Sequence, residues 1–532
     1  MTPVQLDPAI RPGGTQPRAF AQPTREAGGG LALGLAPART ATGLDLTPSF
    51  FSGFATEPLM LARSLLTLAD ITATRYFQYV PTTMRDPVLT ANGDRLRAET
   101  FSACNGVYAR LDLLGGGFDG GEIARGTTNV DLGMHSRSLL SGIQRAALLH
   151  LDVGATGLTL ATPSIQSSER PVDMPDRWVR ALGNVAALHE HLTPQIVLSA
   201  HEARAFLAAV PPATASGTTV WLVPARGGVR VTERPTPGAV SIAGLHRLSA
   251  AKRLLTHVTG LTVYGTAPSD TGVAAVVIEL PHARLTLGLT AEPWRGHSGE
   301  GALLAALAGE QVVADSELVS ALLAYEPAID AQRIAHEAGL SLERARGALA
   351  VLAASGRVGW DLHDQAHFHR ELPDDPARVE RDNPRLVAAK SLAAAGRVSE
   401  ITGTPITAGP APDSAHAAPD FAAPGSGTPG SGVPDAAPRV WRVHGATAVE
   451  DSIVREATAA HAAERTGDSA GDSASNFTDD PTGELSCSCT WALTHGTGRG
   501  PCKHILAVSL WRSAAHSSST QRSTSHLPKE PA

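Results

Sequence analysis

The chain has 532 residues, of which 42% are hydrophobic and 18% are charged. This balance excludes a wholly disordered or fibrous protein, and the length is enough for two or more domains with separate cores. The formal net charge of −7 excludes a chain coated throughout with basic residues for nucleic-acid binding, but it leaves room for a local basic patch. Neither a signal peptide nor an apolar run of ~20 residues is visible, so we expect a cytoplasmic protein with reduced thiols.

The first 310 residues are predicted to form an irregular arm and an α+β body. Residues 1–46 are rich in Ala, Gly, Pro and Thr and lack periodicity, which predicts a disordered arm. In the body, residues 47–310, apolar residues recur at helical spacing in some segments and alternate in others. Helices are predicted at 58–73, 134–149, 176–191, 200–209 and 244–258. Strands are predicted at 106–114, 126–132, 218–225, 228–233, 260–265, 272–280 and 283–290, with a hairpin at 150–163.

Polar residues of the body leave an enzymatic function open as the alternative. Six of them lie near predicted strands: Glu99, Asn105, Arg110, Asp112, Asn129 and Asp131. They either converge into a site or make hydrogen bonds at strand ends, and we favour the second interpretation. Cys104 is a candidate nucleophile, but a lone cysteine among apolar residues is more typical of a small buried side chain. We therefore assign no catalytic residue.

Residues 311–400 are predicted to form a winged-helix-like domain. Three helices are followed by two alternating segments, and Ser341 and Gly356 stand where a helix cap and a helix end are expected. Arg344 and Arg346 lie early on the third helix, where they can reach DNA. However, nine acidic residues outnumber five arginines between 311 and 371, and this excess favours docking to a protein.

The C-terminal part of the chain concentrates its cysteines. A linker rich in Pro, Gly and Ala at 401–438 precedes a finger module at 439–515, and 516–532 is predicted to be a disordered tail. Three of the four cysteines lie in the module. Cys487 and Cys489 are two residues apart, so in an extended strand they face one ion. Cys502 and His504 are also two apart and would diverge on a helix, so we expect Cys502 before or at the first helical turn and His504 just inside the helix.

Three thiolates and one imidazole satisfy tetrahedral Zn²⁺ as a closed structural site with no open position for a substrate. Sulfur ligands argue against magnesium and calcium. We predict one structural zinc ion, with His495 as the rival to the four ligands named above.

These residues resemble a known family. The Cys-x-Cys pair in "CSC", followed after a loop by Cys-x-His in "CKH", is similar to the SWIM zinc finger pattern. The strand "WRVHG" and the helix "CKHILAVSLW" resemble that family's ββα arrangement, and "FSACNGVYARLDLL", "GTTNVDLG" and "WRGHSGEGALL" resemble stretches of bacterial SWIM finger proteins. The resemblance implies Cys487, Cys489, Cys502 and His504 as ligands. It also implies interaction with DNA or protein and names no reaction.

Basic residues near the finger are few. Arg499 and Lys503 can form a small patch at the loop and the start of the helix, which serves either phosphate contacts or simple solvation. We predict a zinc-binding finger protein that is not an enzyme and that binds protein partners, DNA or both. The alternative is an enzyme of unidentified reaction in the body, targeted by the finger. No small-molecule substrate and no membrane association are predicted.

Overall fold

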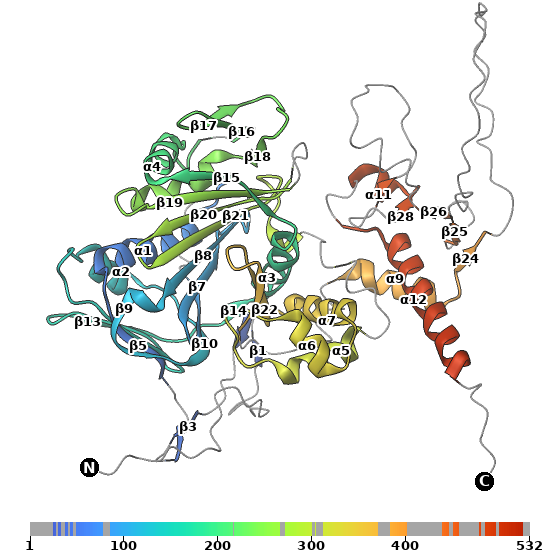
Figure 1. Ribbon diagram of the computed structural model, residues 1–532, viewed down its shortest axis with the longest axis horizontal. Helices are drawn as coiled ribbons and strands as arrows, with labels where there is room; N and C mark the ends of the chain where they lie inside the picture. The colour runs from blue at the N-terminus through green and yellow to red at the C-terminus, as the bar shows by residue number, and fades with distance from the viewer. Residues whose placement is uncertain are drawn as a thin grey trace, which may run out of the picture. The chain divides into compact units, whose positions relative to one another are not determined.

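A computed structural model gives the fold of the chain (Figure 1). It describes residues 25–27, 30–32, 38–40, 43–45, 49–77, 86–215, 217–266, 272–299, 304, 312–370, 383–401, 439–445, 451–456, 478–479, 485–495 and 500–524. The chain divides into two compact units. The first comprises residues 1–384 with 498–500, and the second comprises 385–497 with 501–532.

An antiparallel sheet of eight strands forms the centre of the first unit. Neighbouring strands pair in the order β10-β6-β7-β8-β21-β20-β19-β15. Their bounds in that order are Arg125–Asn129, Val88–Asn92, Arg95–Phe101, Val107–Leu114, Ala283–Leu289, Ala274–Leu280, Gly260–Gly265 and Thr193–Ser199. The strands predicted at 106–114, 260–265, 272–280 and 283–290 are confirmed, and the structure shows that they are neighbours in one sheet.

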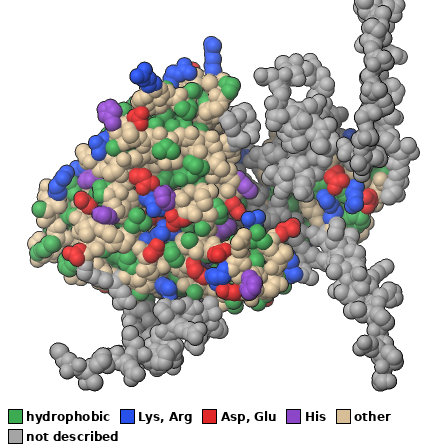
Figure 2. Space-filling view, in the orientation of Figure 1, with side chains coloured by type: hydrophobic (Ala, Val, Ile, Leu, Met, Phe, Trp, Pro, Cys, Tyr) green, Lys and Arg blue, Asp and Glu red, His purple; other side chains and the backbone are tan. Residues whose placement is uncertain are grey.

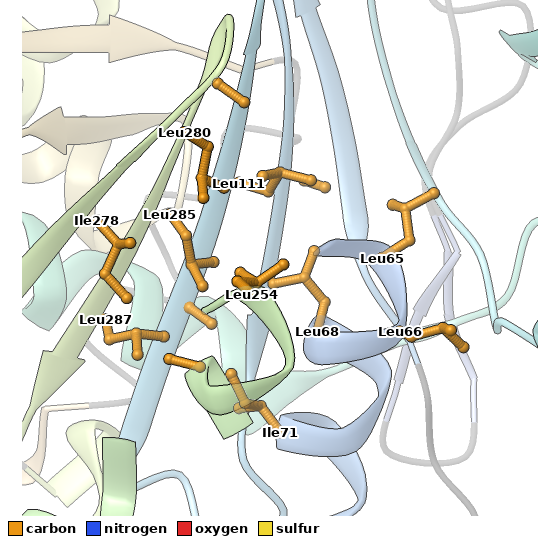
Figure 3. Packing of buried hydrophobic residues seen from close by; sticks show 14 of the residues in the cluster. Leu65, Leu66, Leu68, Ile71, Leu111, Leu254, Ile278, Leu280, Leu285 and Leu287 are labelled. Carbon is orange, nitrogen blue, oxygen red and sulfur yellow. The ribbon is translucent and has the colours of Figure 1, made fainter. Parts of the chain in front are cut away.

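One face of this sheet is apolar. The helix α1 (Pro58–Ala73) and the 3₁₀ helix η2 (Leu245–Leu254) pack together over it. Figure 3 shows leucines of α1 and η2 converging on leucines and an isoleucine of β8, β20 and β21. Fully burying one such side chain contributes ~1.5–3 kcal/mol, so this layer is the main source of stability in the unit.

The opposite face carries charged residues on the same strands, because successive strand residues point to opposite sides. Arg97 of β7 and Arg110 of β8 are at most 1% exposed. Asp361, at the end of β22 (Val358–Asp361), accepts a hydrogen bond from Arg97 at 2.6 Å and lies 2.9 Å from Arg110 Nη2. Both arginines also pair with Asp112 of β8, at 2.8 and 2.9 Å. These buried ion pairs fix the hairpin that contains Asp361 to the sheet.

Next to the ion pairs, the helix α3 (Asp176–His189) closes the same face with apolar contacts. Trp178 and Leu182 of α3 cluster with Val88, Phe101 and Tyr108 of the sheet. Tyr108 also donates a hydrogen bond to Glu99 at 2.6 Å, and Glu99 pairs with Arg370 at 3.1 Å. The sheet is therefore covered on both faces, which is why its strands carry few exposed residues.

The segment predicted as three helices and a hairpin contains those elements. They are α5 (Val312–Leu322), α6 (Ala331–Ala338), α7 (Leu342–Ala354) and the strands β22 and β23 (Ala366–His369). Ser341 caps α7 by accepting a hydrogen bond from the Arg344 amide at 3.3 Å, as the sequence predicts. Gly339 ends α6 in the left-handed conformation, with φ of +66°.

Smaller sheets complete the α+β architecture of the first unit. One has the order β13-β12-β11-β5-β9 and another the order β17-β16-β18. The strands of the first are Gln166–Glu169, Gly157–Ala161, His150–Gly154, Ser49–Ala55 and Phe118–Ile123. Those of the second are Gly228–Thr232, Thr219–Ala225 and Val240–Ala243. The hairpin predicted at 150–163 corresponds to β11 and β12, and the helix α4 (Ala200–Ala209) matches its prediction.

Three predicted elements differ from the structure. The helix expected at 134–149 ends early, as α2 (Met134–Ser141), with Gly142 as its C-cap residue, and a turn then leads into β11. The helix expected at 244–258 is the 3₁₀ helix η2, which follows Gly244 in the left-handed conformation. Within the arm predicted as disordered, the described residues form short strands: β1 (Arg25–Ala27), β2 (Gly30–Ala32), β3 (Ala38–Thr40) and β4 (Gly43–Asp45). β2 is held by pairing with β14 (Met174–Pro175).

The described residues of the second unit form a five-stranded antiparallel sheet and three helices. The strand order is β24-β25-β26-β28-β27. The strands are Val398–Glu400, Val440–Val443, Ser452–Glu456, Leu485–Cys487 and Thr478–Asp479, and the helices are α9 (Pro384–Ala394), α11 (Thr490–His495) and α12 (Lys503–Thr524). The finger is therefore larger than the predicted ββα unit, because β24 from the segment before the linker pairs with β25. The helix α12 also runs to Thr524, beyond the predicted start of a disordered tail.

Candidate metal centre

The three cysteines and the histidine predicted as metal ligands come together in the second unit. Cys487 is the last residue of β28, which lies between β26 and β27. Cys489 follows in the turn before α11, so the two cysteines are not on one continuous strand as the sequence suggested. Cys502 precedes α12 and His504 is its second residue, which confirms the predicted arrangement of this pair.

The distances between the four side chains suit a single ion. Their ligand atoms all lie within 4.8 Å of one another, and Cys487 Sγ is 3.9 Å from His504 Nδ1. Tetrahedral bonds of ~2.3 Å to sulfur and ~2.0 Å to nitrogen place neighbouring ligand atoms ~3.5–3.8 Å apart. The four residues can therefore hold a metal ion with little movement.

Backbone amides support two of the sulfurs. The amide of Ala492 donates to Cys489 Sγ at 3.4 Å, and the amide of Ile505 donates to Cys502 Sγ at 3.5 Å. Each donor lies in the first turn of the helix that follows its cysteine, α11 or α12. Hydrogen bonds of this kind favour the thiolate over the thiol, which is the form that binds a metal.

Without a cation, the thiols resist losing all three protons together. Hydrogen bonds from the Cys487 and Cys502 thiols lower the pKa of Cys489. The pKa of Cys487 is raised, because its thiol donates to Cys489 and because it is buried. That of Cys502 is raised to about 12, since hydrogen bonding and repulsion from Cys489, together with burial, outweigh the opposing contribution from Cys487. A positive ion held by the three sulfurs would favour the thiolate form of all of them.

The helix α12 has its buried face directly after the ligands. Ile505, Leu506, Ala507 and Val508 are at most 2% exposed, and α12 contacts β25, β26 and β28. Trp441 of β25 is fully buried, and the Arg512 guanidinium lies 5.5 Å from its ring centroid. The metal ligands thus join the sheet to the helix at the point where this apolar layer begins.

A groove runs beside the ligands within the second unit. Its volume is about 990 Å³. Three ligands line it, namely Cys489, Cys502 and His504, and α9 forms another side. The further lining residues are Arg385, Ala388, Ser391, Leu392, Ala395, Arg397, Gly445, Asp451, Ser452, Ser488, Thr490, Trp491 and Lys503.

The other predicted site residues are dispersed. Lys503 is exposed at the start of α12, beside the ligands. Arg344 pairs with Asp315 of α5 at 2.6 Å, and Arg346 is exposed on α7. Arg499 lies outside the described residues. His495, the rival ligand, is not in the cluster, and its ring stands edge-on to Trp491 at 5.0 Å.

The polar residues considered for catalysis split into two groups. Glu99, Arg110 and Asp112 converge, but they are buried in ion pairs with Arg97, Arg370 and Asp361. The residues Asn105, Asn129 and Asp131 are not part of these ion pairs. Sequence reasoning missed Arg97, Asp361 and Arg370. The alternating charged residues on β7 and β8 could have indicated a charged face of the sheet, but not the partners of these residues.

Comparisons with known proteins do not assign the chain to a family. No protein-family model matches the chain, and no curated protein matches it. Three solved structures cover 45–46% of the chain and 97–99% of their own chains. They are the Proliferating Cellular Nuclear Antigen of Entamoeba histolytica (10% identity, TM-score 0.31), a PCNA2–PCNA3 complex of Sulfolobus tokodaii (8%, 0.33) and A. fulgidus PCNA with the C-terminal region of FEN-1 (13%, 0.30). Similarity at this level supports no statement about function.

Within the part of the chain that the structure describes, no helix combines the length and apolar character needed to span a bilayer.

Proposed function

We propose that the second unit is a SWIM-type zinc finger with one structural Zn²⁺, held by Cys487, Cys489, Cys502 and His504. The observation that carries the proposal is the convergence of three sulfurs and one imidazole within 4.8 Å. Thiolate sulfur favours zinc over magnesium or calcium. Four protein ligands complete a tetrahedral shell, so the ion has no position for a substrate, and its contribution is to order the unit.

The proposed role of this finger is to bind other proteins. Outside the groove beside the ligands, the described surface gives little support for a phosphate-binding role. Figure 2 shows Lys and Arg side chains intermixed with Asp and Glu on the visible face. Near the finger, Arg512 lies 3.4 Å from Glu456, so a neighbouring carboxylate offsets its charge. Phosphate binding needs several basic side chains on one face.

DNA binding by a winged helix is the second candidate, and the exposed Arg344 and Arg346 at the start of α7 favour it. Two observations count against it. The hairpin that would serve as the wing is almost entirely buried, with Asp361 inside the sheet's ion pairs. Arg344 is already paired with Asp315. We expect a double Arg344→Ala and Arg346→Ala variant to bind duplex DNA no differently from the parent chain.

The zinc proposal is tested by metal analysis of protein purified without added metal. We expect one zinc per chain in the parent and in Cys104→Ser, whose cysteine lies in the other unit, and none in Cys487→Ser. Substitution with Co²⁺ should give the intense visible absorption of a tetrahedral site with sulfur ligands. A parent chain without zinc, or a Cys487→Ser chain that retains it, would overturn the proposal.

A further inference from the structure

The groove beside the metal ligands has an apolar side and a basic rim. Ala388, Leu392 and Ala395 lie four and three residues apart, so they form one stripe along α9 and its end. The basic side chains that line the groove are Arg385, Arg397 and Lys503, and the one acidic side chain is Asp451.

Asp451, the acidic residue of the lining, already makes polar contacts with two residues that precede it in the chain. Asp451 Oδ1 accepts a hydrogen bond from the Gly445 amide at 3.1 Å, and its Oδ2 lies 3.1 Å from His444 Nδ1. Lys503 is exposed and has no ion pair with any residue that the structure describes. In the zinc-loaded form the lining carries three basic side chains against Asp451 and the net charge of −1 of a zinc ion bound by three thiolates. A small excess of positive charge therefore faces an occupant of the groove.

Two of the cations are held in place by contacts that fix their position. Arg397 Nη1 donates to the Gly445 carbonyl at 2.7 Å. Arg385 Nη1 donates to the Pro501 carbonyl at 3.0 Å, and its guanidinium stacks over Trp491 with 4.4 Å to the ring centroid. Ordering these side chains in advance lowers the entropy that a ligand must overcome.

We propose that this groove binds a short peptide segment of a partner protein in which acidic residues alternate with apolar ones. The inference rests on the proposed zinc finger, because three of the zinc ligands form part of the groove. Acidic side chains would meet Arg385, Arg397 and Lys503, and apolar ones would cover the α9 stripe. A volume of about 990 Å³ is at the upper end for ligand pockets and suits a few residues of extended chain.

A nucleic-acid strand fits this groove less well. A phosphate backbone has no apolar group to cover Leu392 and the two alanines. Base stacking needs a free aromatic face, and Trp491 already has Arg385 over its ring and His495 against it.

The test uses the full-length zinc-loaded chain and fluorescence anisotropy. The probes are two pools of labelled decapeptides, in which random apolar residues alternate with either Asp and Glu or Lys and Arg, and a labelled duplex DNA of random sequence. The acidic pool should bind more tightly than the basic pool. Lys503→Glu, which reverses a charge of the rim, and Ser391→Trp, which fills the groove from α9, should each weaken this binding about tenfold or more.

Two matched variants serve as controls. Arg442→Glu reverses an exposed charge of β25 that does not line the groove, and Ala394→Trp adds the same bulk at an exposed position of α9 outside it. Both should bind like the parent. Zinc content is measured on every variant. A variant that loses zinc reports on the proposed finger itself, whereas a variant that keeps zinc and loses peptide binding reports on the groove.

Three results would overturn the inference. They are no binding of the acidic pool by the zinc-loaded parent, equal binding of both pools, or equal weakening by the groove variants and their controls. Binding of duplex DNA that falls steeply with salt and is lost in Lys503→Glu would assign the groove to phosphate instead.

Discussion

The two units of the chain reach an ordered state by different means. The first unit buries apolar layers on a sheet of eight strands and adds balanced ion pairs on the opposite face. The second has a sheet whose five strands have two to five residues each, and its ligand cluster lies where the sheet meets α12. A domain with a large core needs no cofactor to fold, whereas a small one often needs a metal. The contrast predicts that the metal controls only the second unit.

The largest expected effect is the loss of the second unit in Cys487→Ser. A structural zinc contributes on the order of 10 kcal/mol to the folding of a small module at neutral pH. Removing one thiolate should therefore release the ion and unfold β28 and α12, while the first unit keeps its thermal transition. Calorimetry of Cys487→Ser beside Cys104→Ser measures this. A single thermal transition of the whole chain that shifts in Cys487→Ser would contradict the prediction that the metal controls only the second unit.

The converse change is Asp361→Ala, which acts on the first unit alone. It leaves Arg97 and Arg110 buried with only Asp112 to balance them, and breaking a buried pair in this way costs ~3–5 kcal/mol. Urea unfolding of the first unit should show that loss, with zinc content unchanged. Asp364→Ala is the control, because Asp364 is 20% exposed and its pairs with Arg95 and Arg284 lie at the rim. A cost below ~1 kcal/mol for Asp361→Ala would mean that the ion pairs do not hold the hairpin.

The stability of the first unit should also fall with acid through its buried histidines. Burial lowers the pKa of His297 and of His367, each to about 4, below the ordinary value of 6.5. Between pH ~4 and pH ~6.5 the unfolded chain therefore binds more protons than the folded chain. The contribution of these histidines to the free energy of unfolding is fully present above pH ~6.5 and decreases as the pH falls toward 4. The expected slope is ~1.4 kcal/mol per pH unit for each histidine.

Urea unfolding across this pH range, followed by a signal from the first unit, measures that slope. His297→Gln should reduce this slope by ~1.4 kcal/mol per pH unit, which corresponds to the binding of one proton. His201→Gln is the matched control, because His201 is exposed on α4 and should leave the slope unchanged. An unchanged slope in His297→Gln would contradict the assignment of the effect to this buried ring.

The sequence was most informative where local chemistry decides the structure. Ser341 marked the start of α7, and Gly356, with a φ of +80°, follows its C-cap residue as expected. The apolar periodicity of 58–73 predicted α1 within its observed bounds. The four candidate metal ligands were readable because cysteines are scarce in the chain and their spacing permits one ion.

Long-range partners were not readable in the same way. Nothing local to Asp361 indicates that it meets Arg97, 264 residues away in sequence. The groove was unreadable for the same reason. Arg385, near the start of α9, and Arg397, beyond its end, line the groove with three of the candidate ligands, which lie about a hundred residues further along the chain. The helix expected at 134–149 ended at Ser141, although the apolar periodicity continues beyond that residue, because periodicity alone does not indicate where the chain turns toward β11.

The most direct test of the account is hydrogen exchange of the full-length chain with and without a zinc chelator, resolved by segment. The account predicts that chelation removes protection from β28 and the first turns of α12, and leaves the amides of β8, β20 and β21 as slow as before. Unchanged protection of β28 and α12 in chain shown to be free of zinc would contradict it.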